Sequence, residues 1–262
     1  MNNVTASESK TASRFNHRAE DYAAYRPGYP AGALDFLREE LKLSPASIIA
    51  DVGSGTGLLS ESFLRNGNEV FGVEPNDEMR AAAESRLQSY PNFKSVKGTA
   101  EATTLAGASF DFVAAGQAFH WFDTDRARAE FARILKPGGY AVIIWNLRRT
   151  NSTSFLRDYE ALLRRVGTDY DKVAKSYAKE EDLHRFFDGD YRMKRFDNSQ
   201  TFDFTGLRGR TLSASYVPLA GQPGHEELLA GLREIFDRHH HNGTVEHQYD
   251  TEIYYGKVVS SQ

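Results

Sequence analysis

The sequence predicts an α/β fold with a mostly parallel sheet and helices on both of its faces. Between residues 46 and 146, short apolar runs alternate with segments of helical periodicity, and turns that contain glycine or proline separate them. A glycine-rich loop directly follows the first apolar run. Such alternation indicates parallel strands, because each helix returns the chain across the sheet before the next strand begins.

Five strands and four helices are expected in this first part of the chain. The apolar runs are SIIADVG (47–53), NEVFGVEP (68–75), NFKSVKGTA (92–100), SFDFVAAGQAF (109–119) and YAVIIWN (140–146). The helical segments are ALDFLREEL within 31–42, TGLLSESFLRNG (56–67), NDEMRAAAESRLQ (76–88) and DRARAEFARILKPGG (125–139). Asn76 or Asp77 is the expected cap of the third helix, and Gly67 is the expected stop of the second.

The rest of the chain is expected to complete the same domain. Helices are predicted over about 152–188 and 225–240, and strands over 191–204 and 251–259. No low-complexity linker separates these segments from the first part. We therefore expect a disordered polar tail over 1–13 and one domain over 14–262, in which residues 14–30 and about 150–220 cover a core at about 46–146.

Composition and charge exclude several classes of function. The 262 residues are 40% hydrophobic and 26% charged, which is typical of a globular protein. A formal net charge of −4 gives no basic footprint for nucleic acid. The chain has no cysteine, so disulfides, thiolate nucleophiles and cysteine metal ligands are absent. No metal is expected at His239–His241 either, because adjacent residues on a helix point in different directions.

Nothing in the sequence resembles a targeting or membrane segment. The N-terminus, MNNVTASESKTASRF, is polar and has no apolar stretch of the kind that secretory signals carry. No apolar run approaches the length that a membrane-spanning helix needs. A soluble, cytoplasmic protein without a membrane partner is the expectation, and the oligomeric state stays open.

The sharpest motif is IIADVGSGTG, a strand followed by a glycine loop that opens a helix. This is the context of a nucleotide-binding loop, in which glycines let a ligand approach the backbone amides and the helix N-terminus. Glu74 ends the next strand, where an acid can accept hydrogen bonds from ribose hydroxyls. Leu58 stands where a dinucleotide fingerprint has its third glycine, and no GK[ST] follows the loop. The structural alternative is a tight turn whose glycines only allow close packing.

Several motifs together resemble the S-adenosylmethionine-binding core of class I methyltransferases. They are DVGSGTG, VEPNDEM, GTAEATTLAGASFD, the strand that ends in AGQAFHWF, and ILKPGGYAVIIWN, and they cover about residues 46–146. The resemblance implies a Rossmann-like sheet of seven strands with the last strand antiparallel, for which TEIYYGKVV is suitable. It also implies S-adenosyl-L-methionine as the cofactor.

The resemblance assigns cofactor roles to individual residues of this chain. The loop that contains Gly53, Ser54, Gly55 and Gly57 would pass beneath the methionine part, and Asp51 would orient that loop or reach the amino group through water. Glu74 would hold the ribose hydroxyls, and Pro75 and Asn76 would line the adenine. Ala100 and Glu101 would bracket the adenine edge. Gln117 would face the methionine amine, and Met79 is either an adenine contact or a core residue.

Two flanking segments resemble a narrower group, the methyltransferases related to trans-aconitate methyltransferase, which methylate small acids. The segments are RFNHRAEDYAAYRPGYP and RGRTLSASYVP. In that group the N-terminal segment folds over the cofactor, which makes Tyr22, Tyr25 and Arg26 candidates to close the pocket. Arg26 could pair with the cofactor carboxylate. The alternative is that the tyrosines pack and that Arg26 is solvated.

The substrate would lie where strands end, because ligands of parallel sheets bind at the carboxyl ends of the strands. His120 there is a candidate catalytic base, a substrate contact or a brace for the loop, and Trp121 is a candidate pocket wall. Asp123 is expected to cap the following helix. The other candidates for the substrate side lie at the end of the fifth predicted strand or follow it, and are Trp145, Asn146, Arg148 and Arg149. Candidates for the cover are Ser213, Ser215 and Tyr216. Arg148 and Arg149 either clamp an acidic substrate or are solvated loop charges.

The leading hypothesis is an S-adenosylmethionine-dependent methyltransferase that acts on a small molecule by in-line displacement, with a carboxylate oxygen as a candidate acceptor. A carboxylate is already ionised at neutral pH, so alignment suffices, whereas a hydroxyl or amine needs a base. Two alternatives stay open. One is a nicotinamide-dependent oxidoreductase, which Leu58 disfavours, and the other is a binding module without catalysis. The acceptor atom and the identity of the substrate are open as well.

Overall fold

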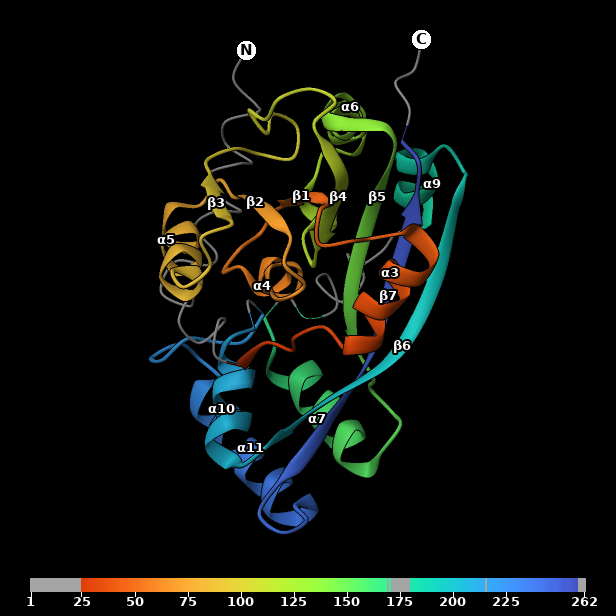
Figure 1. Cartoon of the computed structure of the whole chain (residues 1–262). Coiled ribbons are helices and arrows are strands. Elements are labelled where there is room, and N and C mark those ends of the chain that lie inside the picture. Colours follow the sequence, from red (N-terminus) through yellow and green to blue (C-terminus); the bar gives the residue numbers. More distant parts are fainter. Residues whose placement is uncertain (1–24, 169, 171–179, 215, 259–262) are drawn as a thin grey trace.

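The computed structural model describes residues 25–168, 170, 180–214 and 216–258, and these form one seven-stranded sheet with helices on both faces (Figure 1). The strand order is β3-β2-β1-β4-β5-β7-β6. The strands are β1 (Ile48–Val52), β2 (Glu69–Val73), β3 (Phe93–Val96), β4 (Phe110–Gly116), β5 (Leu135–Arg148), β6 (Tyr191–Phe202) and β7 (Val245–Gly256). The expected tail over 1–13 and the segment 14–24 lie outside the described residues.

Strand directions follow from the connections between the strands. The pairs β3–β2, β2–β1, β1–β4 and β4–β5 are parallel, and helices connect β1 to β2, β2 to β3, and β4 to β5. The last strand, β7, runs antiparallel to both of its neighbours, β5 and β6. The predicted fold class, with the final strand antiparallel, is therefore confirmed. The carboxyl ends of β1 and β4 meet at one edge of the sheet.

Two hydrophobic cores cover the two faces of the sheet. The helices are α3 (Ala31–Leu41), α4 (Leu58–Arg65), α5 (Asp77–Leu87), α6 (Thr124–Ile134), α7 (Ser154–Val166), α9 (Glu180–Phe187), α10 (Phe204–Leu212) and α11 (His225–His239), with a 3₁₀ turn at Phe119–Trp121. Apolar residues of α6 and α9 pack on one face, and those of α3, α4 and α5 pack on the other. Strand side chains alternate between the cores, so Val113 joins the first core and Phe112 the second.

A third core lies beyond the end of the sheet, where β6 and β7 extend as a long ribbon (Figure 1). It joins α7, α10 and α11 to Phe202 and Val245 at the far end of that ribbon. Leu156 and Leu163 of α7 and Leu232 of α11 are almost completely buried there. Full burial of such a leucine contributes about 1.5–3 kcal/mol to folding, so this part of the chain has its own source of stability.

Some element boundaries differ from the predicted ones for local reasons. The helix expected over 125–139 ends at Ile134, and LKPGG opens β5 instead. Pro137 cannot continue a helix, and Gly138 adopts a φ of 84°, which favours glycine. The last strand begins at Val245 rather than near residue 251. Helix α10 was not predicted, because Gly206 and Gly209 lower its helical propensity.

Candidate functional site

The glycine loop connects β1 to α4 and has a different requirement for glycine at each position. Gly53, Gly55 and Gly57 all have positive φ angles, of 68°, 55° and 82°. A Cβ atom on Gly53 would lie 2.6 Å from the Cβ of Ala118, and one on Gly57 would lie 2.7 Å from Leu87. A Cβ on Gly55 would meet nothing within 4 Å. Close packing therefore accounts for two of the glycines, while Gly55 faces open space of the kind a ligand needs.

Glu74 fixes the glycine loop to the end of β2. Its carboxylate accepts hydrogen bonds from the backbone N–H of Gly55 and of Asn76, both at 2.9 Å. Asn76 in turn caps α5 by accepting from the N–H groups of Glu78 and Met79, as predicted. Burial raises the pKa of Glu74 above its ordinary value, although the two backbone hydrogen bonds oppose the shift. The carboxylate is thus anchored beside the loop that the sequence motif singled out.

Asp51 is a buried carboxyl at the end of β1 with one unsatisfied oxygen. Its Oδ2 accepts a hydrogen bond from the hydroxyl of Ser60 at 2.6 Å. Its Oδ1 is buried and has no hydrogen-bond partner among the residues that the structure describes. Burial raises the pKa of Asp51 to about 7. A buried acceptor of this kind is suited to an ammonium or hydroxyl donor supplied by a ligand.

A cavity of about 330 Å³ opens between the glycine loop, the ends of β4 and β5, and the third core. Asp51 and residues 53–56 form its first wall. Gly116 and Gln117 at the end of β4 and Asn146–Arg148 at the end of β5 form the second. The rest of the lining consists of Arg26, Pro27, Tyr29, Leu58, Leu59, Thr150, Tyr170, Arg210 and Tyr216. The cavity thus lies at the carboxyl ends of parallel strands, where the sequence analysis expected a ligand.

Gln117 turns the chain at the edge of the cavity. Its φ is 59°, a left-handed conformation that is uncommon for a residue other than glycine. Two hydrogen bonds to β5 hold it, from its backbone N–H to the carbonyl of Ile144 and from its Nε2 to the carbonyl of Asn146. Strained residues of this kind are found at ligand sites more often than elsewhere.

Residues 25–30 cross the ends of β5 and β6 and form another wall. Asn146 donates from Nδ2 to the carbonyls of Pro27 and Gly28, at 3.3 and 3.2 Å, and Asn198 also donates to Gly28, at 2.9 Å. Arg26 lines the cavity and donates to the carbonyl of Ser213 at 3.2 Å. Side-chain amides of the sheet therefore hold the backbone of this segment over the site.

The wall opposite the glycine loop is cationic. Arg148 donates from Nη2 to Glu160 at 2.5 Å and to the hydroxyl of Tyr170 at 2.8 Å, and its guanidinium stacks 5.0 Å from the ring centre of Tyr159. Its Nη1 is buried and has no hydrogen-bond partner in the described part of the chain. Arg210 lies on the same wall, is 5% exposed, and donates from Nε to the hydroxyl of Tyr249 at 3.2 Å.

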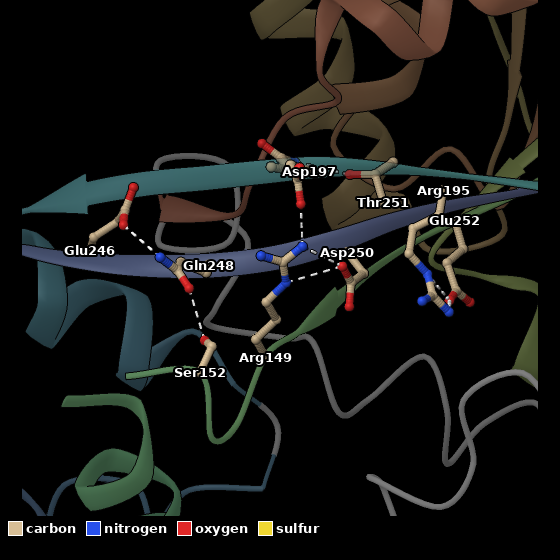
Figure 2. Close-up of polar contacts among 10 residues, drawn as sticks. Arg149, Ser152, Arg195, Asp197, Glu246, Gln248, Asp250, Thr251 and Glu252 are labelled. Atoms are coloured by element: carbon tan, nitrogen blue, oxygen red, sulfur yellow. Dashed lines mark hydrogen bonds and ion pairs between the residues drawn. The ribbon is translucent and has the colours of Figure 1, made fainter. Parts of the chain in front are cut away.

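The structure separates Arg148, the last residue of β5, from Arg149, which follows it. Arg149 points to the other side of the β5–β7–β6 ribbon, where it forms ion pairs with Asp250 and Asp197 (Figure 2). Because successive residues of a strand face opposite sides, only Arg148 of this pair reaches the cavity. The clamp of two adjacent arginines is therefore corrected to one of them, and Arg149 is a partly exposed residue of an ion-pair cluster.

Three expected substrate-side residues lie elsewhere. Trp145 is fully buried in the first core, with its ring 5.9 Å from Phe119 and 5.6 Å from Tyr254, because its side chain leaves the opposite face of β5 from Asn146. His120 and Trp121 contact each other in the 3₁₀ turn with their rings tilted by 44°, and both lie outside the cavity lining. Burial lowers the pKa of His120 to about 4.

The expected cover residues also divide into separate groups. Tyr25 packs its ring against Gly209 of α10 and does not line the cavity, so for this tyrosine the packing alternative holds. Tyr216 does line it, and Ser213 contributes a backbone carbonyl to Arg26. Tyr22 and Ser215 lie outside the described residues.

The residues expected around an adenine gather beside the glycine loop but outside the cavity. Ala100 is buried, and Glu101 accepts a hydrogen bond from the backbone N–H of Asp123 at 2.9 Å. Asp123 caps α6, as predicted, by accepting from Arg126. Pro75 is exposed and Met79 is buried. The adenine roles of these residues stay predictions.

Some lining residues carried no signal in the sequence. Tyr170 and Arg210 come from segments whose pattern shows only helices and turns, and they reach the site through tertiary packing, whereas Tyr29 lies in the predicted cover segment 14–30 but was not singled out. The single hint for Arg210 was its place within RGRTLSASYVP. In the described residues no helix is long and apolar enough to cross a membrane, and no group of three or more His, Cys, Asp or Glu side chains is arranged to hold a metal ion.

Comparison with known proteins identifies the family of this core. Residues 50–143 match the family model described as a methyltransferase domain. A methyltransferase-like protein of Schizosaccharomyces pombe is 29% identical over 84% of this chain and 85% of its own length. A second methyltransferase of that organism is 34% identical over 55% of this chain, and that match spans 57% of the relative.

A solved structure supports the same fold. A candidate type II methyltransferase from Anaeromyxobacter dehalogenans superposes with a TM-score of 0.63 at 22% identity, over 90% of this chain and all of the other. The region 50–143 is therefore a methyltransferase domain, and the protein is a methyltransferase with S-adenosylmethionine as its cofactor. The narrower likeness to the trans-aconitate methyltransferase group is not shown by these matches.

Proposed function

We propose that this methyltransferase transfers the methyl group of S-adenosylmethionine to a carboxylate oxygen of a small molecule. The observation that carries the proposal is the charge of the cavity: Arg26, Arg148 and Arg210 line the same space as the glycine loop. Arginine is the side chain best suited to carboxylate recognition, because its planar donors match the two carboxylate oxygens. Such a lining attracts an acidic acceptor and disfavours a cationic amine.

The titratable side chains of the lining favour a methyl acceptor that is already ionised and needs no base. Within the described part of the chain, the lining contains no imidazole, and Asp51 is its only carboxyl group. A hydroxyl or amine acceptor must lose a proton, whereas a carboxylate has none to lose at neutral pH. His120 lies outside the lining and its lowered pKa makes it a weak base at neutral pH. A base is not needed for a carboxylate.

Residues of the first wall are suited to hold the cofactor. Gly55 leaves open space beside its backbone, and Glu74 is anchored next to it, where it would accept from ribose hydroxyls. The unsatisfied Oδ1 of Asp51 and the side chain of Gln117, which both line the cavity, would receive the ammonium group of the cofactor. Arg26 is the candidate partner for the cofactor carboxylate, with Pro75, Asn76, Ala100 and Glu101 assigned to the adenine.

The proposed reaction is an in-line displacement. The bound cofactor supplies a methyl group on a positively charged sulfur. The acceptor oxygen forms a bond to the methyl carbon while the carbon–sulfur bond breaks, and the electron pair of that bond stays on sulfur. No proton moves, and a methyl ester results. The contribution of the protein is alignment of the acceptor and exclusion of water.

The test is a transfer assay with labelled S-adenosylmethionine against a panel of small carboxylic acids, alcohols and amines. We expect label in the acids, in products that release methanol in mild base, as methyl esters do. Label only in base-stable products from alcohols or amines would contradict the carboxylate acceptor. Cofactor binding without label in any product would favour the non-catalytic alternative.

A further inference from the structure

The cavity contains a buried positive charge that no carboxylate of the described residues balances. Arg210 has no ion pair within the described ranges, and the one hydrogen bond of its side chain goes to the neutral hydroxyl of Tyr249. A buried charge without a partner carries a desolvation penalty of several kcal/mol. A protein keeps such a group where a ligand of opposite charge supplies the missing interaction.

Arg148, on the same wall, differs from Arg210 in this respect. Glu160 accepts from Arg148 at 2.5 Å, and its own side chain is 12% exposed, so the two charges largely cancel. Tyr170 also donates to Glu160. Arg148 can therefore give a bound anion a hydrogen bond from its buried Nη1, whereas Arg210 can give it an unbalanced positive charge.

The surroundings of Arg210 hold it in place without neutralising it. Tyr249 receives the hydrogen bond from Arg210 and donates its own proton to Gln200 at 3.0 Å. Gln200 in turn donates to the carbonyl of Tyr25, in the segment that walls the cavity. The neighbouring His247 is fully buried, and burial together with the charges of Arg210 and Arg148 lowers its pKa well below the ordinary value. Tyr249, Gln200 and His247 therefore contribute no negative charge to balance that of Arg210.

We propose that Arg210 is the specificity-determining residue of the enzyme, and that it supplies the counter-charge for the anionic group of the acceptor. This inference rests on the proposed function, since it assigns the choice of an acidic acceptor to one residue. Arg148 is a second hydrogen-bond donor to the same group, held by Glu160. The ligand class is a carboxylate or another oxyanion that can accept from a guanidinium.

The first experiment uses inorganic phosphate as the probe and does not depend on turnover. Binding of phosphate to the full chain is measured by calorimetry at constant ionic strength, for the native protein, Arg210→Met, Arg210→Lys and the control Arg208→Met. Arg208 lies on the same helix but is exposed. We expect Arg210→Met to weaken phosphate binding by about tenfold or more, Arg210→Lys to weaken it less, and Arg208→Met to leave it unchanged.

Thermal unfolding without any anion separates this role from a structural one. Arg210→Met removes an unbalanced buried charge and should leave Tm unchanged or raise it. Arg148→Met should lower Tm, because it removes one of the two arginines that pair with the largely buried Glu160. Arg210→Lys keeps the charge, so its phosphate affinity tests the proposal even if Arg210→Met does not fold.

Two results would overturn the inference: absence of phosphate binding by the native protein, or equal phosphate affinity in the native protein and the folded Arg210 variants. These are distinguishable from failure of the proposed function. An enzyme that methylates no carboxylic acid but binds phosphate through Arg210 would lose its proposed acceptor and keep its anion site.

Discussion

The carboxylate of Glu74 accepts a hydrogen bond from the backbone N–H of Gly55 at 2.9 Å, which ties the end of β2 to the glycine loop after β1. The side chain of Glu74 is thereby anchored beside the loop that contains Gly55. Glu74→Ala removes this tie and the proposed ribose acceptor together. We expect it to weaken S-adenosylmethionine binding by about tenfold or more in calorimetry. Glu84→Ala, an exposed acid of α5, is the control, and equal losses in both variants would refute the ribose role.

The glycine loop predicts different outcomes at two of its positions. Gly53→Ala forces a Cβ to 2.6 Å from that of Ala118, which cannot rotate away, and should destabilise the fold by about 2–4 kcal/mol in urea unfolding. Gly55→Ala meets only its unfavourable φ, so about 1 kcal/mol is expected. Its larger effect should be on cofactor affinity. Undiminished affinity in folded Gly55→Ala would show that the open space beside this glycine is not used.

Asp51 predicts a pH dependence of stability in the cofactor-free protein. Burial raises its pKa from 3.8 to about 7, so the folded chain keeps a proton that the unfolded chain releases. Stability from this group is complete below about pH 4 and is lost as pH rises to about 7, at up to about 1.4 kcal/mol per pH unit. Asp51→Asn should be less sensitive to pH over this range and more stable than the native protein at pH 8. Urea unfolding at several pH values measures this, and parallel curves for both proteins would contradict it.

Trp145 is predicted to matter for stability and not for the acceptor. Trp145→Phe leaves a void in the first core, and a loss of about 1–3 kcal/mol is expected in urea unfolding. The KM for the acceptor should not change, because the ring lies on the face of β5 away from the cavity. A raised KM with unchanged stability would restore the pocket role that the sequence suggested.

His120 is predicted not to set the pH profile of the reaction. Its pKa of about 4 and its position outside the cavity lining keep it from acting as the base near neutral pH. The pH dependence of kcat/KM for His120→Asn should match that of the native enzyme between about pH 6 and 8. Loss of a limb of that profile in the variant alone would show that His120 moves a proton.

The structure agrees best with the sequence predictions that rest on residues close together in the chain. The strand, glycine loop and helix around Asp51 could be predicted because glycine spacing and strand periodicity are both local signals. Asn76 and Asp123 could be predicted as caps for the same reason. Arg148 was a candidate because it follows the predicted strand over 140–146. Nothing local told it apart from Arg149, since a one-residue difference in register decides which side of a ribbon a side chain faces.

The rest of the site depends on contacts between distant segments. Arg210 reaches the cavity from α10, a helix with two glycines, and Glu160 meets Arg148 only because α7 packs under the ribbon. Trp145 is a large side chain with one polar group, the indole N–H. Its residue type therefore suits a pocket wall as well as a core, and the sequence alone could not assign it to the core. Which side chains share a cavity is set by the tertiary fold, which a single sequence does not display.

The β6–β7 ribbon carries the third core beyond the edge of the sheet, and the cavity lies between that core and the first two. Arg210 and Glu160, the ion-pair partner of Arg148, come from helices of the third core, whereas the glycine loop belongs to the sheet. Arg210 and the partners of Arg148 can change with the helices that carry them while the glycine loop and Glu74 stay as they are. A chain built this way can acquire a new acceptor by exchanging one module of its architecture, with the methyl donor unchanged.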